Sequence, residues 1–382
     1  MIREQVEPRP EWRERLEAVG FTFHSIDGVY WEEQVCYRFE PAEIDRLDDV
    51  TAELHGMCLE AIDHIVRQGR YDELAVPDRY RDRIAASWQR REPTIYGRFD
   101  FSYDGYNPPK LLEYNADTPT SLLETAVAQW FWLEELKPGC DQFNLLHERL
   151  IEHWRSLRPP TRTDTVLPLH LHFGCVHDSE EDFRTVEYLR DTAAQAGFTT
   201  FQVFIEDIGW NGRQFVDLEG RPIQGLFKLY PWEWLVREEF GPLLLHDTTA
   251  LIEPWWKMLL SNKGLLVILW ELFPDHPNLL PSYRSADRLG RHYVKKPLYS
   301  REGASIELHD SDQVVKAPGD YGDEGWVYQA AAPLPSFDGR NYVVVGSWIA
   351  GDRTAGIGLR EDNTLITRNT SRFVPHYFIP DN

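Results

Sequence analysis

The stretch from residue 96 to residue 118 constrains the fold more than any other part of this chain. Apolar and polar side chains alternate over residues 98–103, which is the period of a strand with one buried face. The sequence DGYNPP at residues 104–109 favours a turn, and the alternation resumes over residues 110–115. The sequence therefore predicts a β-hairpin at this place.

This hairpin would bring three oxygen-bearing side chains close together, those of Asp100, Glu113 and Asn115. Glu113 and Asn115 are two positions apart, so their side chains leave the same face of one strand. Two carboxylates and an amide oxygen suit Mg²⁺, which keeps a few such ligands together with nucleotide phosphates. Arg98 shares a face with Asp100 and is placed to meet a phosphoryl group. On spacing alone, a solvated hairpin edge with aligned charges is the simpler interpretation.

The same residues resemble the magnesium signature of ATP-grasp ligases. The fuller text, YGRFD at residues 96–100 and LLEYNADTPTS at residues 111–121, is similar to the synthetase domain of glutathionylspermidine synthase and its stand-alone relatives. The resemblance recurs from about Arg98 to His376. It implies an α+β protein with a circularly permuted, glutathione synthetase-like ATP-grasp fold, because the magnesium-binding strand here precedes the lysines that bind the nucleotide.

The resemblance and the apolar periodicity together divide the chain into four expected parts. An N-terminal helical region occupies residues 1–95, where apolar residues recur at spacings of three and four. The metal-binding hairpin and helices of the ATP-grasp core occupy residues 96–160, and a nucleotide-binding part occupies residues 247–382. Between them, strand and helix patterns alternate over residues 161–246, which predicts a small α/β pre-ATP-grasp layer on the substrate side.

The resemblance assigns nucleotide binding mainly to the second half of the chain. By position it implies that ATP is bound by Arg98, Lys263, Lys296, Gly303, Gln329, Ala330, Leu365 and Ile366. Lys263 precedes an apolar helix, where a cation is unfavourable beside the positive helix end, so an anionic partner is expected. Gly303 lies in a loop between strands, where a small residue lets backbone N–H groups approach phosphate.

Three arginines are implied to act in catalysis, namely Arg98, Arg301 and Arg360. Arg98 matches the arginine that stabilises phosphoryl transfer, and the other two match arginines on loops that close over the site. Such closure excludes water, which matters because an acyl phosphate hydrolyses readily. Glu302, beside Arg301, stands where characterised synthetases have a smaller uncharged residue.

Four residues are candidates for substrate binding: Thr118, Glu180, Glu181 and Lys228. Glu180 and Glu181 open an expected helix, where the helix dipole favours negative charge, and this is the structural explanation. In polyamine-conjugating relatives a Glu-Glu pair at the matching place binds the amine, which is the functional alternative. Thr118 stands where those enzymes use a serine beside glutathione. Lys228 is kept, although Leu229 beside it replaces a hydroxyl residue.

The composition indicates a folded and acidic protein. Hydrophobic residues make up 42% of the chain, which excludes a disordered protein. The 40 basic and 62 acidic residues give a net charge of −22, which repels nucleic acid and anionic membranes and attracts polycations, although ordinary solubility also explains it. Neither a nucleic-acid nor a membrane partner is therefore expected. Four scattered cysteines, and the absence of a signal-peptide or membrane-length pattern, predict a cytoplasmic protein with reduced thiols.

The sequence therefore predicts an ATP- and Mg²⁺-dependent carboxylate–amine ligase that acts through an acyl phosphate. Its expected substrates are a peptide-type acid and a polyamine or other amine, as for glutathionylspermidine synthase. The alternative is a catalytically silent nucleotide-binding or scaffold protein that keeps the fold. The ligase is favoured because six positions are kept together, namely Arg98, Asp100, Glu113, Asn115, Lys263 and Lys296.

Overall fold

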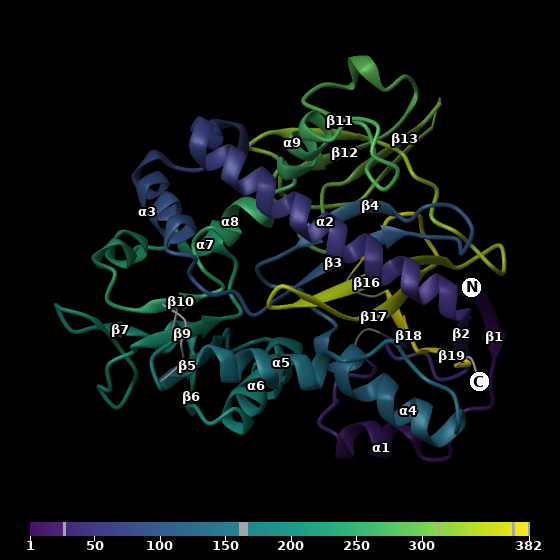
Figure 1. The fold of residues 1–382 in the computed structure, drawn as a ribbon, viewed down its shortest axis with the longest axis horizontal. Helices are drawn as coiled ribbons and strands as arrows, with labels where there is room; N and C mark the ends of the chain where they lie inside the picture. The colour runs from purple at the N-terminus through teal and green to yellow at the C-terminus, as the bar shows by residue number, and fades with distance from the viewer. Residues whose placement is uncertain (26–27, 160–166, 312, 369–370, 381–382) are drawn as a thin grey trace.

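The predicted hairpin forms one side of an antiparallel sheet at the centre of the molecule (Figure 1). The computed structural model describes residues 1–25, 28–159, 167–311, 313–368 and 371–380. The strand order of this central sheet is β18-β17-β16-β3-β4. Its strands are β3 (Tyr96–Ser102), β4 (Lys110–Asn115), β16 (Tyr342–Ala350), β17 (Arg353–Asp362) and β18 (Arg372–Val374).

Strands β3 and β4 pair in the register that the metal-site hypothesis requires. Asp100 lies opposite Glu113, and Arg98 lies opposite Asn115. A β-bulge after Asp100 leaves Leu112 without a partner in the ladder, since the next pair joins residue 101 to residue 111. The hairpin prediction is confirmed, and the predicted ligands lie side by side on the two strands.

The expectation that only one face of β3 is buried is wrong, because every residue of Tyr96–Ser102 is buried. On the apolar face, Phe99 stacks on Tyr114 with ring centroids 3.8 Å apart, and both belong to the core beneath α2 (Pro41–Gln68). On the polar face, Arg98 and Asp100 are buried because a second sheet folds over them. A pattern of alternating polarity therefore marks a cavity wall here and not a solvent face.

A second antiparallel sheet of five strands covers the polar face of the hairpin, above the central sheet in Figure 1. The order of its strands is β11-β15-β12-β13-β14. They are β11 (Ser282–Tyr283), β12 (His292–Pro297), β13 (Glu307–Asp310), β14 (Gln313–Lys316) and β15 (Trp326–Ala330). Helix α9 (Leu265–Leu272) packs against β11 and β15, following the short helix α8 (Lys257–Leu260).

The middle of the chain forms the α/β layer that the alternating pattern predicts. Its sheet has the order β10-β9-β5-β6, and every neighbouring pair is parallel. The strands are β5 (His170–Cys175), β6 (Thr199–Phe204), β9 (Gly225–Lys228) and β10 (Ala250–Ile252). Helix α6 (Glu180–Gln195) connects β5 to β6 and packs beside α5 (Leu146–Ser156). The expected boundary at residues 160 and 161 lies outside the described residues.

The first 95 residues contain the expected helices and also two strands. The helices are α1 (Trp12–Ala18), α2 and α3 (Asp78–Gln89). Helix α2 begins with Pro41 after a reciprocal cap between Glu40 and Glu43, and it ends at Gly69 with a φ of 67°. Strands β1 (Ile2–Gln5) and β2 (Val35–Phe39) join the C-terminal β19 (His376–Phe378). The expectation of a mainly helical region did not include these strands, because β2 pairs with a strand at the other end of the chain.

Short elements connect these layers. They are η1 (Arg70–Leu74), the π-helical turn η2 (Glu124–Ala128) that leads into α4 (Gln129–Leu136), η3 (Ile205–Asp207), the ribbon of β7 (Gly209–Trp210) and β8 (Phe215–Val216), α7 (Trp232–Leu235), η4 (Gly241–His246) and η5 (Ala286–Arg288). Among the described residues, no helix has the length and apolar character needed to span a bilayer. The four cysteines are free thiols.

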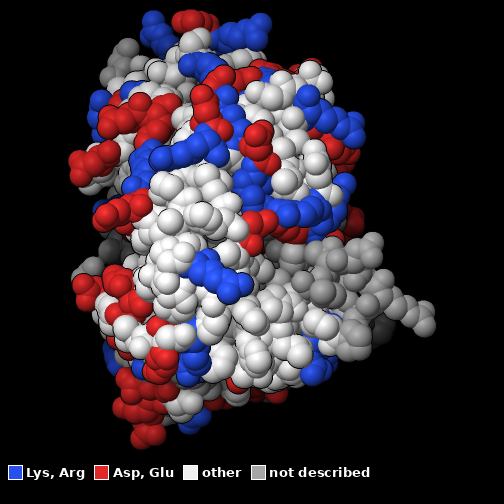
Figure 2. All heavy atoms as spheres, turned by 90° about the vertical axis from the view of Figure 1, so that its left-hand side faces the viewer, with Lys and Arg blue, Asp and Glu red and all other residues white. Residues whose placement is uncertain are grey.

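Charges are mixed on the face of the molecule that carries α3. Figure 2 shows Lys and Arg interspersed with Asp and Glu over the upper part of this face, above a broad uncharged area. Arginines of α3 take part in this pairing: Arg81 lies 2.7 Å from Asp78, and Arg83 lies 2.7 Å from Asp247. On this face the acidic excess is therefore broken up by paired arginines.

Candidate active site

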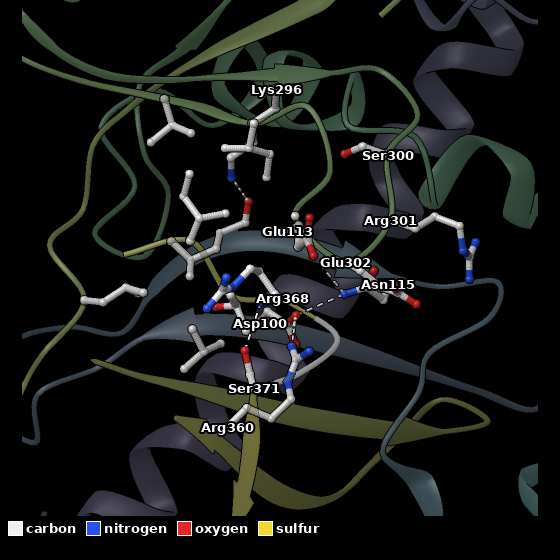
Figure 3. A pocket seen from close by; sticks show the side chains of 18 of the residues that line it. Asp100, Glu113, Asn115, Lys296, Ser300, Arg301, Glu302, Arg360, Arg368 and Ser371 are labelled. Carbon is white, nitrogen blue, oxygen red and sulfur yellow. Dashed lines mark hydrogen bonds and ion pairs between the residues drawn. The ribbon is translucent and has the colours of Figure 1, made fainter. Parts of the chain in front are cut away.

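A cavity of about 520 Å³ lies between the central sheet and the second sheet. It is lined by residues of the hairpin, of β12 and β15, of the loop at residues 300–303 and of the segment after β17. It brings together most residues that the sequence singled out: Arg98, Asp100, Glu113, Asn115, Thr118, Lys296, Arg301, Gly303, Gln329, Ala330, Arg360, Leu365 and Ile366. Figure 3 shows Asp100, Glu113, Asn115 and Arg360 pointing toward a common space, with Arg301 at its side.

The three predicted metal ligands converge at one point in this cavity. The Asn115 amide nitrogen lies 3.1 Å from Oδ2 of Asp100 and 3.2 Å from Oε1 of Glu113, so the amide bridges the two carboxylates. Rotating the amide by half a turn directs its oxygen to the same point, which is a donor set that suits Mg²⁺. Among the described residues, no group of three or more His, Cys, Asp and Glu side chains is arranged to hold a metal. The candidate metal site therefore needs the amide oxygen of Asn115 as its third ligand, in addition to the two carboxylates.

Two guanidinium groups share the single carboxylate of Asp100. Arg98 binds it with two nitrogens, at 2.7 Å and 3.1 Å, and Nη2 of Arg360 lies 2.7 Å from Oδ2. Burial, and then the charge of Arg98, lower the pKa of Arg360 below its ordinary value. Two buried cations beside one anion leave positive charge uncompensated. A bound phosphate would compensate it with charge-assisted hydrogen bonds.

The two predicted lysines differ in position: Lys296, on the second sheet, lines the cavity, whereas Lys263, in the turn before α9, is not among the lining residues and contacts the site through Glu113. Nζ of Lys263 lies 3.2 Å from Oε2 of Glu113 and 2.8 Å from the Ser300 carbonyl oxygen, which confirms its expected anionic partner. Nζ of Lys296 donates to Oε1 of Gln329 at 2.7 Å and to the Leu112 carbonyl at 2.8 Å. Leu112 is the residue that the β-bulge adds to β4, and its carbonyl accepts this bond from the Lys296 ammonium.

Burial and charge shift the pKa values of this cluster in opposite directions. Burial lowers the pKa of Lys296 to about 8, an effect that Glu113 opposes and Lys263 reinforces. Burial raises the pKa of Glu113, but the two ammonium groups outweigh it and lower the value to about 2. At neutral pH the site therefore holds an ionised carboxylate between two cations.

The loop at residues 300–303 is shaped by close contact with the opposite wall. Gly303 has a φ of 73°, and a Cβ atom there would collide with the Thr367 carbonyl and the Ile366 side chain. Arg301 donates to the hydroxyl and, at 3.2 Å, to the carbonyl of Thr118, and it lies 3.8 Å from Glu233. The loop is thus tied to the segment that follows the hairpin.

The end of the cavity beside β15 is apolar. Its wall consists mainly of Val294, Ile306, Leu308, Ala331, Val344, Leu365 and Ile366. The backbone N–H of Ala330 donates to the Pro281 carbonyl at 2.7 Å, so this donor is used within the sheet. The backbone N–H of Ala331 is used in the same way, because it donates to the His292 carbonyl at 3.2 Å.

Three predicted substrate residues do not line the cavity. The exposed carboxylate of Glu180 binds the Thr22 hydroxyl at 2.5 Å and lies 3.6 Å from Arg184. Glu181 points inward, and burial together with Glu124 raises its pKa to about 8. Lys228 is buried and donates to Oδ1 of Asp117 at 2.7 Å. The structure thus separates the Glu-Glu pair, because adjacent residues on a helix point in different directions.

A comparison with protein families decides how this chain is related to others. The family described as glutathionylspermidine synthase preATP-grasp matches residues 3–379. The chain belongs to this family. The relationship that the hairpin motif suggested is thereby confirmed over nearly the whole length of the chain.

Relatives of this glutathionylspermidine synthase family member include both similar and longer proteins. A Haemophilus influenzae protein assigned as an acid–amine ligase is 46% identical over 392 residues, which cover 97% of this chain and 98% of that protein. The bifunctional glutathionylspermidine synthetase/amidase of Escherichia coli is 30% identical over 371 residues, covering 88% of this chain and 58% of the enzyme. Trypanothione synthetase of Crithidia fasciculata is 29% identical, covering 94% and 57%. This chain therefore spans less than two thirds of the two longer enzymes.

A solved structure supports the same kind of fold. A glutathione synthetase-like effector of Globodera pallida, in its apo form, aligns with a TM-score of 0.54 over 90% of this chain and 89% of its own. The sequence identity is 11%, so this likeness concerns the fold alone. The protein is a mixed α/β chain with a glutathione synthetase-like arrangement.

Sequence reasoning missed several residues that surround the cavity of this family member. Tyr30, from a segment without an assigned role, lines the cavity and donates its hydroxyl hydrogen to Glu124. Arg368 and Glu233 line it as well. No spacing or motif marks these residues, because each comes from a different element. Glu233 follows Pro231-Trp232, a helix start that the pattern alone does not distinguish from any other.

Proposed function

We propose that this chain is an ATP- and Mg²⁺-dependent carboxylate–amine ligase that forms an amide through an acyl phosphate. The observation that carries the proposal is the cavity in which Asp100, Glu113 and Asn115 meet the cations of residues 98, 296 and 360, while Lys263 pairs with Glu113. Family membership and the acid–amine ligase assignment of a relative support the same reaction class.

The residues of the chain have separate roles in this reaction. The apolar end beside β15 holds the base, and Lys296 and Lys263 bind phosphate oxygens next to Glu113. Bound Mg²⁺ would supply charge stabilisation for the transferring phosphoryl group. Arg98 and Arg360 stabilise the charge that develops when the substrate carboxylate attacks the γ-phosphate. The loop with Arg301 keeps water from the resulting acyl phosphate.

The proposal includes the ATP-grasp fold in a circularly permuted, glutathione synthetase-like form. The hairpin with the metal ligands precedes the strands that carry Lys296 and Gln329, and the two sheets enclose the cavity between them. In this interpretation residues 96–160 and most of residues 247–382 form the ligase core, and residues 161–246 form the pre-ATP-grasp layer on the substrate side. Strand β10 (Ala250–Ile252) belongs to that layer as well, because it pairs with β9. The acidic net charge and free thiols support a cytoplasmic location.

A catalytically silent nucleotide-binding or scaffold protein is the second candidate. Such a protein would need the cavity for nucleotide binding but would not need all of the charged residues that surround it. The Asn115 bridge and the sharing of Asp100 by two arginines place costly charges out of water. These groups bond to one another and at the same time line a cavity that a ligand could occupy. This arrangement favours the ligase.

An assay of coupled ADP and amide formation tests the proposed function. Purified protein with Mg²⁺ and ATP is offered glutathione, γ-glutamylcysteine or glutamate as the acid, and spermidine or hydroxylamine as the nucleophile. The expected result is ADP formation that requires an acid, with a matching amount of amide or hydroxamate. ATP binding without acid-dependent ADP formation for any pair would contradict the ligase and support the silent protein.

Neither of the two adjacent glutamates lines the cavity, but Glu181 is the better candidate for binding the amine because its oxygen Oε1 is enclosed and has no hydrogen-bond partner among the described residues. Replacing it in the variant Glu181→Gln should raise the KM for spermidine by at least about tenfold, because a charge-assisted hydrogen bond is worth roughly 1.5–3 kcal/mol. The matched control is Glu180→Gln, whose side chain binds Thr22 outside the cavity. Its KM for spermidine should change by less than about twofold. If both variants lose stability equally and the KM for spermidine does not change, the two glutamates serve only to stabilise the start of the helix.

A further inference from the structure

A tyrosine that lines the cavity is hydrogen-bonded to a buried carboxylate from a distant part of the chain. The hydroxyl of Tyr30, in the segment between α1 and β2, lines the cavity beside Ser121 at an oxygen–oxygen distance of 3.4 Å. This hydroxyl donates to Oε1 of Glu124, which lies in η2 directly behind the wall. Tyr30 is therefore the link between the cavity and a carboxylate that does not reach it.

Glu124 is an unusual side chain for a protein interior. It is fully buried, and its second oxygen, Oε2, has no hydrogen-bond partner among the described residues. A buried carboxylate with an unpartnered oxygen lowers the stability of the fold, so its presence calls for an explanation such as a role in function. An oxygen of Glu181, Oε1, is enclosed without a partner in the same way. Glu124 and Glu181 thus each have one buried carboxylate oxygen without a hydrogen-bond partner among the described residues.

We propose that Tyr30 passes the proton of the attacking amine to Glu124 during amide formation, an inference that rests on the proposed function. The amine enters as an ammonium, which gives a proton to the Tyr30 oxygen while Tyr30 gives its own proton to Oε1 of Glu124. The neutral nitrogen then forms the C–N bond with the acyl carbon. The C–O bond to phosphate breaks with its electron pair leaving on the phosphate, and the second proton of the nitrogen goes to that phosphate. Tyr30 is the catalytic residue, and Glu124 acts through it.

The surroundings of Glu124 set its pKa and therefore how readily it accepts this proton. Burial raises its pKa to about 7, an increase that the Tyr30 hydroxyl and the charges of Arg98 and Arg360 partly oppose. Glu181 lies close enough that the charge of Glu124 raises the pKa of Glu181. A carboxyl group with a pKa near neutrality is suited to general base catalysis at neutral pH. Burial and Glu124 also keep the pKa of Tyr30 well above its ordinary value, so Tyr30 relays the proton without ionising first.

Two nucleophiles separate proton transfer from the earlier chemistry. Spermidine is a protonated amine at neutral pH and must lose a proton, whereas hydroxylamine is mostly neutral and reacts more easily without a base. With the best acid of the panel, Glu124→Gln should lower the rate of spermidine amide formation by about 10²-fold or more. Its rate of hydroxamate formation should stay within about twofold of the wild-type rate. The fall of wild-type kcat/KM for spermidine below about pH 7 should be absent in this variant.

A second variant and a matched control complete the test. Tyr30→Phe removes the relay and should also lower spermidine amide formation by at least about tenfold, while keeping hydroxamate formation. Tyr37→Phe removes the same kind of bond, a buried tyrosine hydroxyl donating to Glu361, outside the cavity, and should leave both rates unchanged. Loss of both nucleophile reactions to the same extent, or of neither, in Glu124→Gln would overturn the relay. Absence of hydroxamate with wild-type protein would instead contradict the proposed function.

Discussion

Glu113→Gln is expected to lower amide-forming turnover by about 10³-fold, because losing this proposed metal ligand would remove several kcal/mol of charge stabilisation. The side chain lies between the Asn115 amide and the Lys263 ammonium, and its pKa is lowered to about 2 once burial is outweighed by the two lysines. Glutamine keeps the shape and a hydrogen bond to Lys263 but removes the charge. The Mg²⁺ concentration for half-maximal ADP formation should rise by at least about tenfold.

A glutamate outside the cavity provides the control for this variant. Glu307 on β13 lies 3.2 Å from Lys295 and 3.1 Å from Lys316, so Glu307→Gln also removes a carboxylate from a pair of lysines. Its turnover and Mg²⁺ dependence should match those of the wild type within about twofold. Wild-type Mg²⁺ dependence in Glu113→Gln would contradict the metal assignment, whereas equal losses in both variants would indicate a general electrostatic effect.

Lys257→Met is expected to lower the free energy of unfolding by about 3–5 kcal/mol, because it breaks a buried ion pair on one side only. Lys257 is 1% exposed, and its ammonium donates to the Tyr96 carbonyl at 2.7 Å and to the Ala116 carbonyl at 2.9 Å. The Glu253 carboxylate, 3.3 Å away, is also fully buried. The lysine therefore ties together the start of β3 and the end of β4, the two strands that carry the metal ligands.

Urea denaturation measures this effect against two further variants. The double variant Lys257→Met with Glu253→Gln removes both charges and should recover part of the lost stability. Arg67→Met removes an exposed pair, in which Arg67 and Asp63 are 3.0 Å apart, and should cost less than about 1 kcal/mol. A loss in Lys257→Met no larger than that in Arg67→Met would show that the buried pair does not hold the hairpin.

Local patterns predicted the parts of the site that one hairpin supplies. The alternation in Tyr96–Ser102 and Lys110–Asn115 predicted two paired strands, and pairing placed Asp100 opposite Glu113. The unfavourable position of Lys263 at a helix start predicted an anionic partner, and that partner is Glu113. These features follow from short-range rules of strand and helix geometry, which is why spacing was sufficient.

Other features depend on contacts between elements that are far apart in the sequence. The polar face of β3 is buried because the second sheet covers it, and the strand pattern alone predicted solvent there. The direction of Glu180 toward Thr22 depends on how α6 packs against the N-terminal segment. The bond between Tyr30 and Glu124 joins residues 94 positions apart. None of these contacts leaves a local pattern.

By itself, the sequence determined the strands of the hairpin, the helices of the α/β layer, the family and the chemical types of the site residues. It could do so because hydrophobic period, turn residues and helix ends depend on neighbouring positions. Only the tertiary structure decided which charges share the cavity, which glutamate points inward and which buried acid stands behind the wall. Those outcomes depend on packing between distant segments, where burial sets the pKa values that spacing does not reveal.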